Sequence, residues 1–295
     1  MTQDEHMQKD RSGKYLEAYP DVFADMVNAF VFGEQLIKPE DLQDGPTETV
    51  YKAEDGKLLR EQRRDVSKYV KKYNTIISII GMENQTLPDK DMVFRVMGYD
   101  YTSYRAQMDA GKQRYPVITR VLYFGDEPWN EACSIRDAID APEVFKKETA
   151  DYKIQVIDVP RLSEEVRGML TSDFAVVADY FANRYKPDYK PSGQVIKHVN
   201  AVLRLLEVFA DAKYKSIEDE IMEMVQKGED VTMCEYVQRV LKEGRIEGER
   251  YKSESITIKL LKKKTMSYEE IAEIVDEPVE YVKELEKEML AKEGK

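Results

Sequence analysis

The sequence has very little cysteine and histidine. Its 295 residues include two cysteines, Cys133 and Cys234, and two histidines, His6 and His198. The cysteines are far apart and neither lies in a CxxC motif, so the pattern excludes a disulfide framework and a structural zinc site. His6 lies in a polar terminal segment, and we interpret His198 as an ordinary helix residue. Any catalysis must therefore depend on carboxylates.

Long hydrophobic runs and a basic surplus are also missing. No apolar run approaches the roughly 20 residues that cross a bilayer, and residues 1–15 lack the apolar core of a secretion signal. We therefore expect a cytoplasmic protein that makes no membrane contact. Lysine and arginine number 45 against 57 aspartates and glutamates, which gives a net charge of −12. This charge disfavours indiscriminate coating of nucleic acid but permits a local basic groove.

The hydrophobic pattern divides the chain into a mixed half and a helical half. Periodic apolar residues predict helices over residues 20–33 and about 91–112. Strands are predicted over 47–51, 58–72, 75–82, 117–125 and 152–159, and an Asp-Gly turn over 54–57. After residue 160 the predicted elements are helical, over 161–184, 194–212, 215–227 and 233–264. This order is typical of an α/β or mixed α+β fold followed by a helical C-terminal region.

We divide the chain into residues 1–160, a helical region 161–250 and a helical tail 251–295. In the tail, Ser267 and Glu270 form a capping box, and Pro278 begins a second short helix. The spacing is like that of a helix-turn-helix, but the second helix is rich in glutamates that phosphates would repel. We therefore expect the tail to mediate self-association, such as a homodimer, or the binding of a protein partner.

Two carboxylates are placed to bind a metal. Asp65 lies in a strand-like stretch, and Glu83 follows the apolar run 75–82. Magnesium prefers oxygen ligands, and one or two carboxylates with a carbonyl suffice to hold it. Strand alternation puts Glu83 and Gln85 on one face, while the Asn84 side chain points away and its backbone carbonyl is available.

Each of these residues also has a simpler explanation. Asp65 lies among arginines and lysines, so it could form a surface ion pair of little energetic weight. Glu83 and Asn84 could be a polar strand end before a turn. The basic cluster between Arg60 and Lys72 could be a solvated strand face.

Five ordered segments resemble a known family. Asp65, Glu83 and Gln85 look like the PD-(D/E)xK signature of restriction-endonuclease-like nucleases, in which a lysine often occupies the place of Gln85. The wider resemblance is to the transposase-like recombination-promoting nucleases, also called Rpn or Transposase_31-type proteins, over roughly residues 20–160. The matching segments are Phe23-Ala24-Asp25-Met26-Val27-Asn28, Arg64-Asp65-Val66, Gly81-Met82-Glu83-Asn84-Gln85-Thr86, Arg95-Val96-Met97-Gly98-Tyr99-Asp100 and Pro116-Val117-Ile118-Thr119-Arg120-Val121-Leu122-Tyr123-Phe124-Gly125.

The resemblance implies a restriction-endonuclease-like core, with a central mixed sheet flanked by helices, in residues 1–160. It also implies Mg²⁺ (or Mn²⁺) as cofactor and DNA as substrate. Asp65, Glu83 and the Asn84 carbonyl would then hold the metal, and Gln85 would orient water or touch the phosphate. Gln85 has no charge, so a second metal, Arg64 or Lys68 would supply the missing positive charge. The accessory groups would be Asp25, Asn28 and Gln107.

These expectations leave three hypotheses. The first is a Mg²⁺-dependent DNA endonuclease, linked by resemblance to recombination and mobile elements. The second is a catalytically silent scaffold that binds DNA or a protein partner. The third uses the same site for a small nucleotide-like ligand.

Overall fold

A computed structural model describes most of the chain. The described residues are 16–52, 59–63, 65–72, 75–111, 114–186, 188–209, 215–263 and 266–293. Arg64 and the turn expected at 54–57 lie outside them. Two compact units are present, Met1–Cys234 and Glu235–Lys295. None of the described helices has the length and apolar character needed to cross a membrane.

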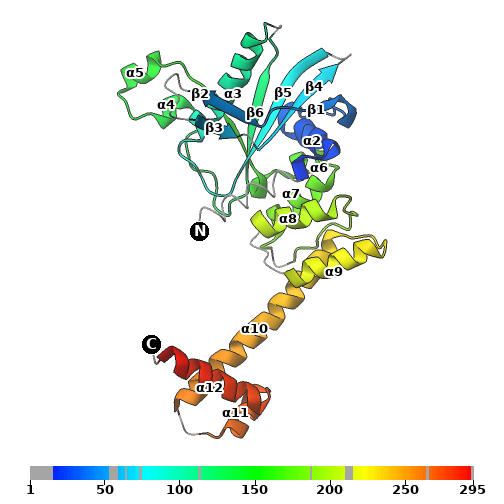
Figure 1. Cartoon of the computed structure of the whole chain (residues 1–295), viewed down its shortest axis with the longest axis vertical. Helices are drawn as coiled ribbons and strands as arrows, with labels where there is room; N and C mark the ends of the chain where they lie inside the picture. Colours follow the sequence, from blue (N-terminus) through cyan, green and yellow to red (C-terminus); the bar gives the residue numbers. More distant parts are fainter. Residues whose placement is uncertain are drawn as a thin grey trace. The chain divides into compact units, whose positions relative to one another are not determined.

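A mixed five-stranded sheet forms the centre of the first unit, in the order β1-β4-β5-β6-β7. Figure 1 shows β1, β4, β5 and β6 of this sheet. β4 is antiparallel to both β1 and β5, whereas β6 is parallel to both β5 and β7. The strands are β1 (Leu42–Asp44), β4 (Val66–Lys72), β5 (Thr75–Gln85), β6 (Val117–Tyr123) and β7 (Gln155–Asp158). A separate antiparallel pair is formed by β2 (Glu48–Lys52) and β3 (Leu59–Arg63). The expected mixed sheet is thereby confirmed.

Helices cover both faces of this sheet (Figure 1). One face packs against α3 (Met92–Asp109), where Val93 and Val96 contact Val121 of β6. The other face packs against α2 (Pro20–Val27), where the Lys68 ammonium lies over the Phe23 ring. A single π-helical turn, η1 (Asn28–Phe32), follows α2 and ends at Gly33, which adopts the left-handed conformation that glycine permits.

Further helices complete the first unit. α7 (Asp173–Asn183) contacts α2. Phe124, which follows β6, stacks on Phe209 of α8 (Val199–Phe209) with ring centroids 4.7 Å apart. The remaining elements are η2 (Pro39–Asp41), α4 (Ile135–Ala138), α5 (Glu143–Glu148), η3 (Val159–Arg161), α6 (Glu164–Met169) and α9 (Lys215–Gln226).

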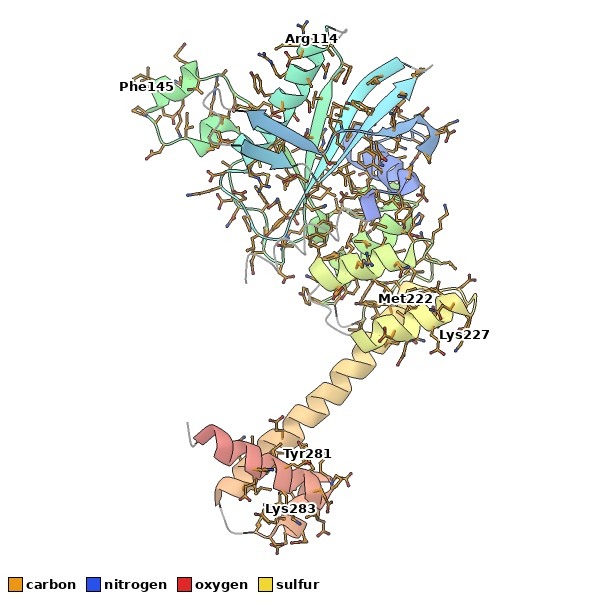
Figure 2. The ribbon with its side chains drawn as sticks, viewed as in Figure 1. Arg114, Phe145, Met222, Lys227, Tyr281 and Lys283 are labelled. Atoms are coloured by element: carbon orange, nitrogen blue, oxygen red, sulfur yellow. The ribbon has the colours of Figure 1, made fainter. Side chains whose placement is uncertain are left out.

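The second unit is helical, as the sequence predicts. It comprises most of α10 (Met233–Lys263), with α11 (Tyr268–Val275) and α12 (Val279–Glu293), around an apolar cluster that includes Leu261 and Val282. The capping box of Ser267 and Glu270 is present. Figure 2 shows Tyr281 and Lys283 on α12, and the Lys283 ammonium lies 5.9 Å from the centre of the Tyr268 ring.

The compact units divide the chain at 234/235 rather than at the expected positions 160 and 250. The helices after residue 160 pack with the sheet because Phe124, which directly follows β6, contacts aromatic residues of α7 and α8. The functional assignment of the three segments remains a prediction.

Candidate active site

The register of two antiparallel strands brings Asp65 and Glu83 together. Asp65 directly precedes β4, and Glu83 lies near the end of β5. Val66 of β4 pairs with Met82 of β5, so the residue before Val66 lies beside the residue after Met82. Residues opposite one another in an antiparallel pair share a face, which explains why two residues 18 positions apart meet.

Backbone hydrogen bonds hold both carboxylates in place. The Asp65 amide donates to Glu83 Oε2 at 3.4 Å, and the Asn84 amide donates to Asp65 Oδ2 at 2.7 Å. Asp65 is 7 % exposed and Glu83 is 2 % exposed. Two acidic groups therefore lie next to each other, largely removed from water.

Helix α3 supplies a cation to this pair. Arg95 Nη2 lies 2.5 Å from Glu83 Oε1, and Arg95 Nη1 lies 2.8 Å from Asp89 Oδ2. Tyr99, one turn further along α3, donates to the same Glu83 oxygen at 3.3 Å. Arg95 thus bridges a buried carboxylate and a partly exposed one.

The electrostatics of the site favour a protonated Glu83. Burial, followed by repulsion from the Asp65 carboxylate, raises the pKa of Glu83 to about 8, although Arg95 acts in the opposite direction. Burial, followed by the charge on Glu83, raises the pKa of Tyr99 to about 12, so its hydroxyl remains a donor. A divalent cation would relieve the repulsion that raises the pKa of Glu83.

Two residues of this cluster were not predicted from the sequence. Glu17, fully buried just before α2, accepts a hydrogen bond from Asn84 Nδ2 at 3.3 Å. Its only sequence signal is a charge between two apolar residues, Leu16 and Ala18. Arg95 has a stronger signal, because it begins one of the segments that carry the family resemblance and lies four residues before Tyr99.

Lys68, one of the two predicted phosphate-binding residues, is not brought to the carboxylates as expected. Lys68 donates to Asp44 Oδ1 at 2.6 Å and to the Ala18 carbonyl at 3.0 Å, on the α2 side of the sheet. It lies three residues after Asp65, and strand alternation sends the two side chains to opposite faces. Arg64 lies outside the described residues. Gln85 ends β5 two residues after Glu83 and is partly exposed.

Asp25 and Asn28 lie at a different place in the fold. Asp25 accepts hydrogen bonds from the Thr171 amide and hydroxyl and from the Ser172 amide, all between 2.9 and 3.0 Å. Asn28 Oδ1 accepts from the Ile37 amide at 2.8 Å, and its Nδ2 donates to the Ile37 carbonyl at 2.8 Å. Both side chains are buried. Their contacts tie loops to α2 and η1.

We expect Asp25→Ala to destabilise the first unit by about 3 kcal/mol, because it leaves buried amides without an acceptor and removes hydrogen bonds to a charged group. Urea unfolding followed by circular dichroism measures the change. Asp91→Ala is the matched control, since Asp91 precedes α3 without capping it through its side chain. Equal stability of the two variants would contradict this structural role for Asp25.

Gln107, the third expected accessory residue, lies two turns beyond Tyr99 along α3. Its Oε1 accepts from the Tyr115 amide at 2.8 Å. The structure therefore places Gln107 in a separate cavity, rather than at Asp65 and Glu83.

Among the described residues, no group of three or more histidines, cysteines, aspartates or glutamates is arranged to hold a metal ion. The donor set at the strand ends is smaller, with two carboxylates and the backbone of Asn84. Such a set still fits magnesium, which keeps several waters and needs only one or two carboxylates from the protein.

Comparison with known proteins supports the expected family. Residues 59–178 match the family model described as "Putative transposase, YhgA-like". The matched segment includes Asp65, the end of β5 and the first turns of α3, so it contains the carboxylate pair and Arg95. No curated protein and no solved structure shows a significant match to this chain. The segment that forms the site therefore carries the sequence signature of transposase-like proteins.

Proposed function

We propose that the protein is a Mg²⁺-dependent DNA endonuclease whose site is built on Asp65 and Glu83. The observation that carries this proposal is the side-by-side burial of the two carboxylates at the meeting ends of β4 and β5. Burying two like charges together is costly unless a cation compensates them. The match of residues 59–178 to a transposase-like family supports DNA as the substrate and a link to recombination and mobile elements.

In this proposal Asp65, Glu83 and the Asn84 backbone carbonyl hold the metal. Bound there, Mg²⁺ (or Mn²⁺) would neutralise the scissile phosphate and lower the pKa of an attacking water. The chain contributes the position of the ligands, because the Asn84 amide orients Asp65 and the Asp65 amide orients Glu83. Exclusion of solvent strengthens every charge interaction at this point.

Arg95 takes the role of the cation that Gln85 cannot supply. Its guanidinium is permanently charged and lies at the carboxylate pair. Its side chain is 39 % exposed, so it reaches from the buried carboxylate to the surface where a phosphate would arrive. We therefore assign the stabilisation of phosphate charge to Arg95 rather than to Lys68.

Metal binding should depend on pH, because Glu83 must lose a proton to become a ligand. Its pKa is raised from 4.5 to about 8. The protonated Glu83 side chain therefore stabilises the folded state fully below about pH 4.5, and this stabilisation is lost as the pH rises to about 8. We expect Mn²⁺ affinity to rise up to about tenfold per pH unit below pH 8 and to level off above it.

Isothermal titration calorimetry of the full chain with Mn²⁺, at pH 6.5 and pH 9 and in buffers of different ionisation enthalpy, measures the affinity and the released proton. Glu83→Gln is the comparison, because it cannot release this proton. An affinity that is the same at both pH values would contradict a protonated Glu83.

The cleavage test uses supercoiled plasmid DNA. We expect the wild-type chain to nick it with Mg²⁺ and to stop when EDTA is present. Asp65→Asn should lose this activity, because the amide keeps the shape but not the charge of a metal ligand. Glu143→Gln, which removes an exposed carboxylate on α5, should nick like the wild type. Nicking that survives Asp65→Asn or EDTA would refute the site.

A catalytically silent scaffold that binds DNA is the second candidate. One observation favours it: Glu83 Oε1 is already engaged by Arg95 and Tyr99, while glutamine stands in the usual lysine position. Retention of plasmid DNA on the wild-type chain, without nicking under any divalent cation, would support this candidate instead.

A further inference from the structure

A small cavity lies on the α3 side of the sheet, between α3 and strands β4 and β5. Its volume is about 210 Å³, below the roughly 300–1,000 Å³ of sites for drug-sized ligands. It therefore fits a single small ring system. The lining residues used below are Tyr69, Ile79, Ser103, Ala106, Gln107 and Tyr115.

One side chain that lines this cavity carries a hydrogen-bond donor with no partner among the described residues. Gln107 is 4 % exposed, and its Oε1 accepts from the Tyr115 amide at 2.8 Å. Its Nε2 makes no hydrogen bond with any part of the chain that the structure describes. A buried donor left without an acceptor costs about 1–3 kcal/mol. The fixed amide orientation thus presents N–H groups to a ligand that carries an acceptor.

The walls favour a neutral, planar ligand. None of the described residues that line the cavity carries a charge, so a phosphate or a metal ion would find no counter-charge there. The rings of Tyr69 and Tyr115 stand edge to face, with centroids 6.2 Å apart and an interplanar angle of 86°. Aromatic side chains of this kind provide stacking surfaces for bases.

The cavity and the carboxylate site share one face and one helix. Arg95, Tyr99 and Gln107 are spaced by four and eight residues along α3, so they form one stripe. From Tyr99 to Gln107 the helix rises about 12 Å. Ile79 and Glu83 lie on the same face of β5, about 13 Å apart along the strand. A single DNA strand can therefore touch both places at once.

We propose that this cavity holds one unpaired, carbonyl-bearing nucleobase of the DNA strand that enters the Asp65–Glu83 site. The inference rests on the proposed function and adds a recognition element to it. The base carbonyl accepts from Gln107 Nε2, and the ring lies against Tyr69 or Tyr115. Thymine suits the cavity, because one of its carbonyls can accept a hydrogen bond from Gln107 Nε2 and its methyl group can pack against Ile79.

The base must leave the duplex to enter the cavity, which costs a few kcal/mol for a paired base and less for an unpaired one. We therefore expect the chain to prefer single-stranded or locally melted DNA over a perfect duplex.

Saturation-transfer NMR and titration of the full chain with thymidine, in EDTA, test the pocket without cleavage. Thymidine should bind, and deoxyribose 5-phosphate, which has no base, should not. Gln107→Glu keeps an acceptor for the Tyr115 amide but removes the free donor, and should weaken thymidine binding about tenfold, the effect of one hydrogen bond. Ser103→Ala is the matched control on the same wall, since its hydroxyl donates to the Tyr99 carbonyl and not into the cavity.

A second variant tests the cavity independently, in case the Gln107→Glu chain does not fold. Ala106 is an exposed residue of α3 that lines the cavity, and Ala106→Leu keeps a good helix former while filling the space. It should also abolish thymidine binding. Absence of thymidine binding to the wild type, or thymidine binding by Gln107→Glu and Ala106→Leu that equals that of the wild type, would overturn the proposal.

The outcomes separate this inference from the proposed function. Plasmid nicking without thymidine binding would overturn the base pocket and leave the nuclease site intact. Thymidine binding that Gln107→Glu weakens, in a chain that does not nick DNA, would support the pocket and refute only the cleavage.

Discussion

Replacing Glu83 with glutamine is expected to reduce Mg²⁺-dependent plasmid nicking by roughly a thousandfold or more, without a loss of stability at pH 8–9. A metal contributes several kcal/mol to charge stabilisation in the transition state, and each 1.36 kcal/mol is a factor of ten in rate. The amide oxygen still accepts from Arg95 and Tyr99. Stability is preserved because the variant loses only the long contact of 3.4 Å from the Asp65 amide to Oε2. The raised pKa of Glu83 indicates that the buried site disfavours the charged carboxylate, so a neutral amide is tolerated there.

Two measurements on the same preparation test this expectation, a nicking time course and a thermal melt at pH 8.5. Glu143→Gln, at an exposed carboxylate, controls for the loss of one negative charge. A variant that melts far below the wild type would identify Glu83 as a structural ion-pair partner of Arg95. Unchanged nicking would remove Glu83 from the proposed metal site.

Replacing Arg95 with methionine is the second change with a large expected effect. We expect nicking to fall by about 10²–10³, the range seen when one group that stabilises transition-state charge is removed. Methionine retains much of the apolar volume along α3, whereas the positive charge at Glu83 is lost. Arg95→Lys restores a charge but not the planar pair of donors that contacts Glu83 and Asp89, so it should recover only part of the activity.

Arg105→Met on the same helix is the matched control. Arg105 is exposed and pairs with Asp109 one turn away, a kind of surface contact worth little energy. Mn²⁺ titration of Arg95→Met adds a readout independent of cleavage, because the metal ligands remain. Equal nicking by Arg95→Met and Arg105→Met would show that Arg95 has no role in charge stabilisation.

In the proposed site, Arg95 would allow an acidic chain to act on DNA. The chain carries a net charge of −12, which repels a polyanion at long range. One arginine fixed at the carboxylate pair acts at short range, beside the buried Glu83 carboxylate, where a low local dielectric constant strengthens its interaction. We therefore expect binding to depend on the site rather than on the general surface charge.

Much of the fold could be predicted from the sequence because its signals are local. The apolar run over residues 75–82 predicted a central strand, and β5 covers it and continues to Gln85. The apolar periodicity from Pro20 predicted the helix that ends at Gly33, and the capping box at Ser267 predicted the start of α11. The carboxylate pair was found by combining strand alternation with the family resemblance, since neither acidic residue stands out alone.

The sequence by itself determined most strands, most helices, a family resemblance and the two acidic residues of the candidate site. The tertiary structure decided which side chains meet them. Strand alternation placed Lys68 on the face of the sheet opposite Glu83. Asp25 accepts a hydrogen bond from Thr171, which lies 146 residues away in the sequence. Packing of α3 against the sheet brought Arg95 to Glu83, and the segment before α2 brought Glu17 to Asn84. Such contacts depend on how elements pack across the sheet, which a local pattern of residues does not encode.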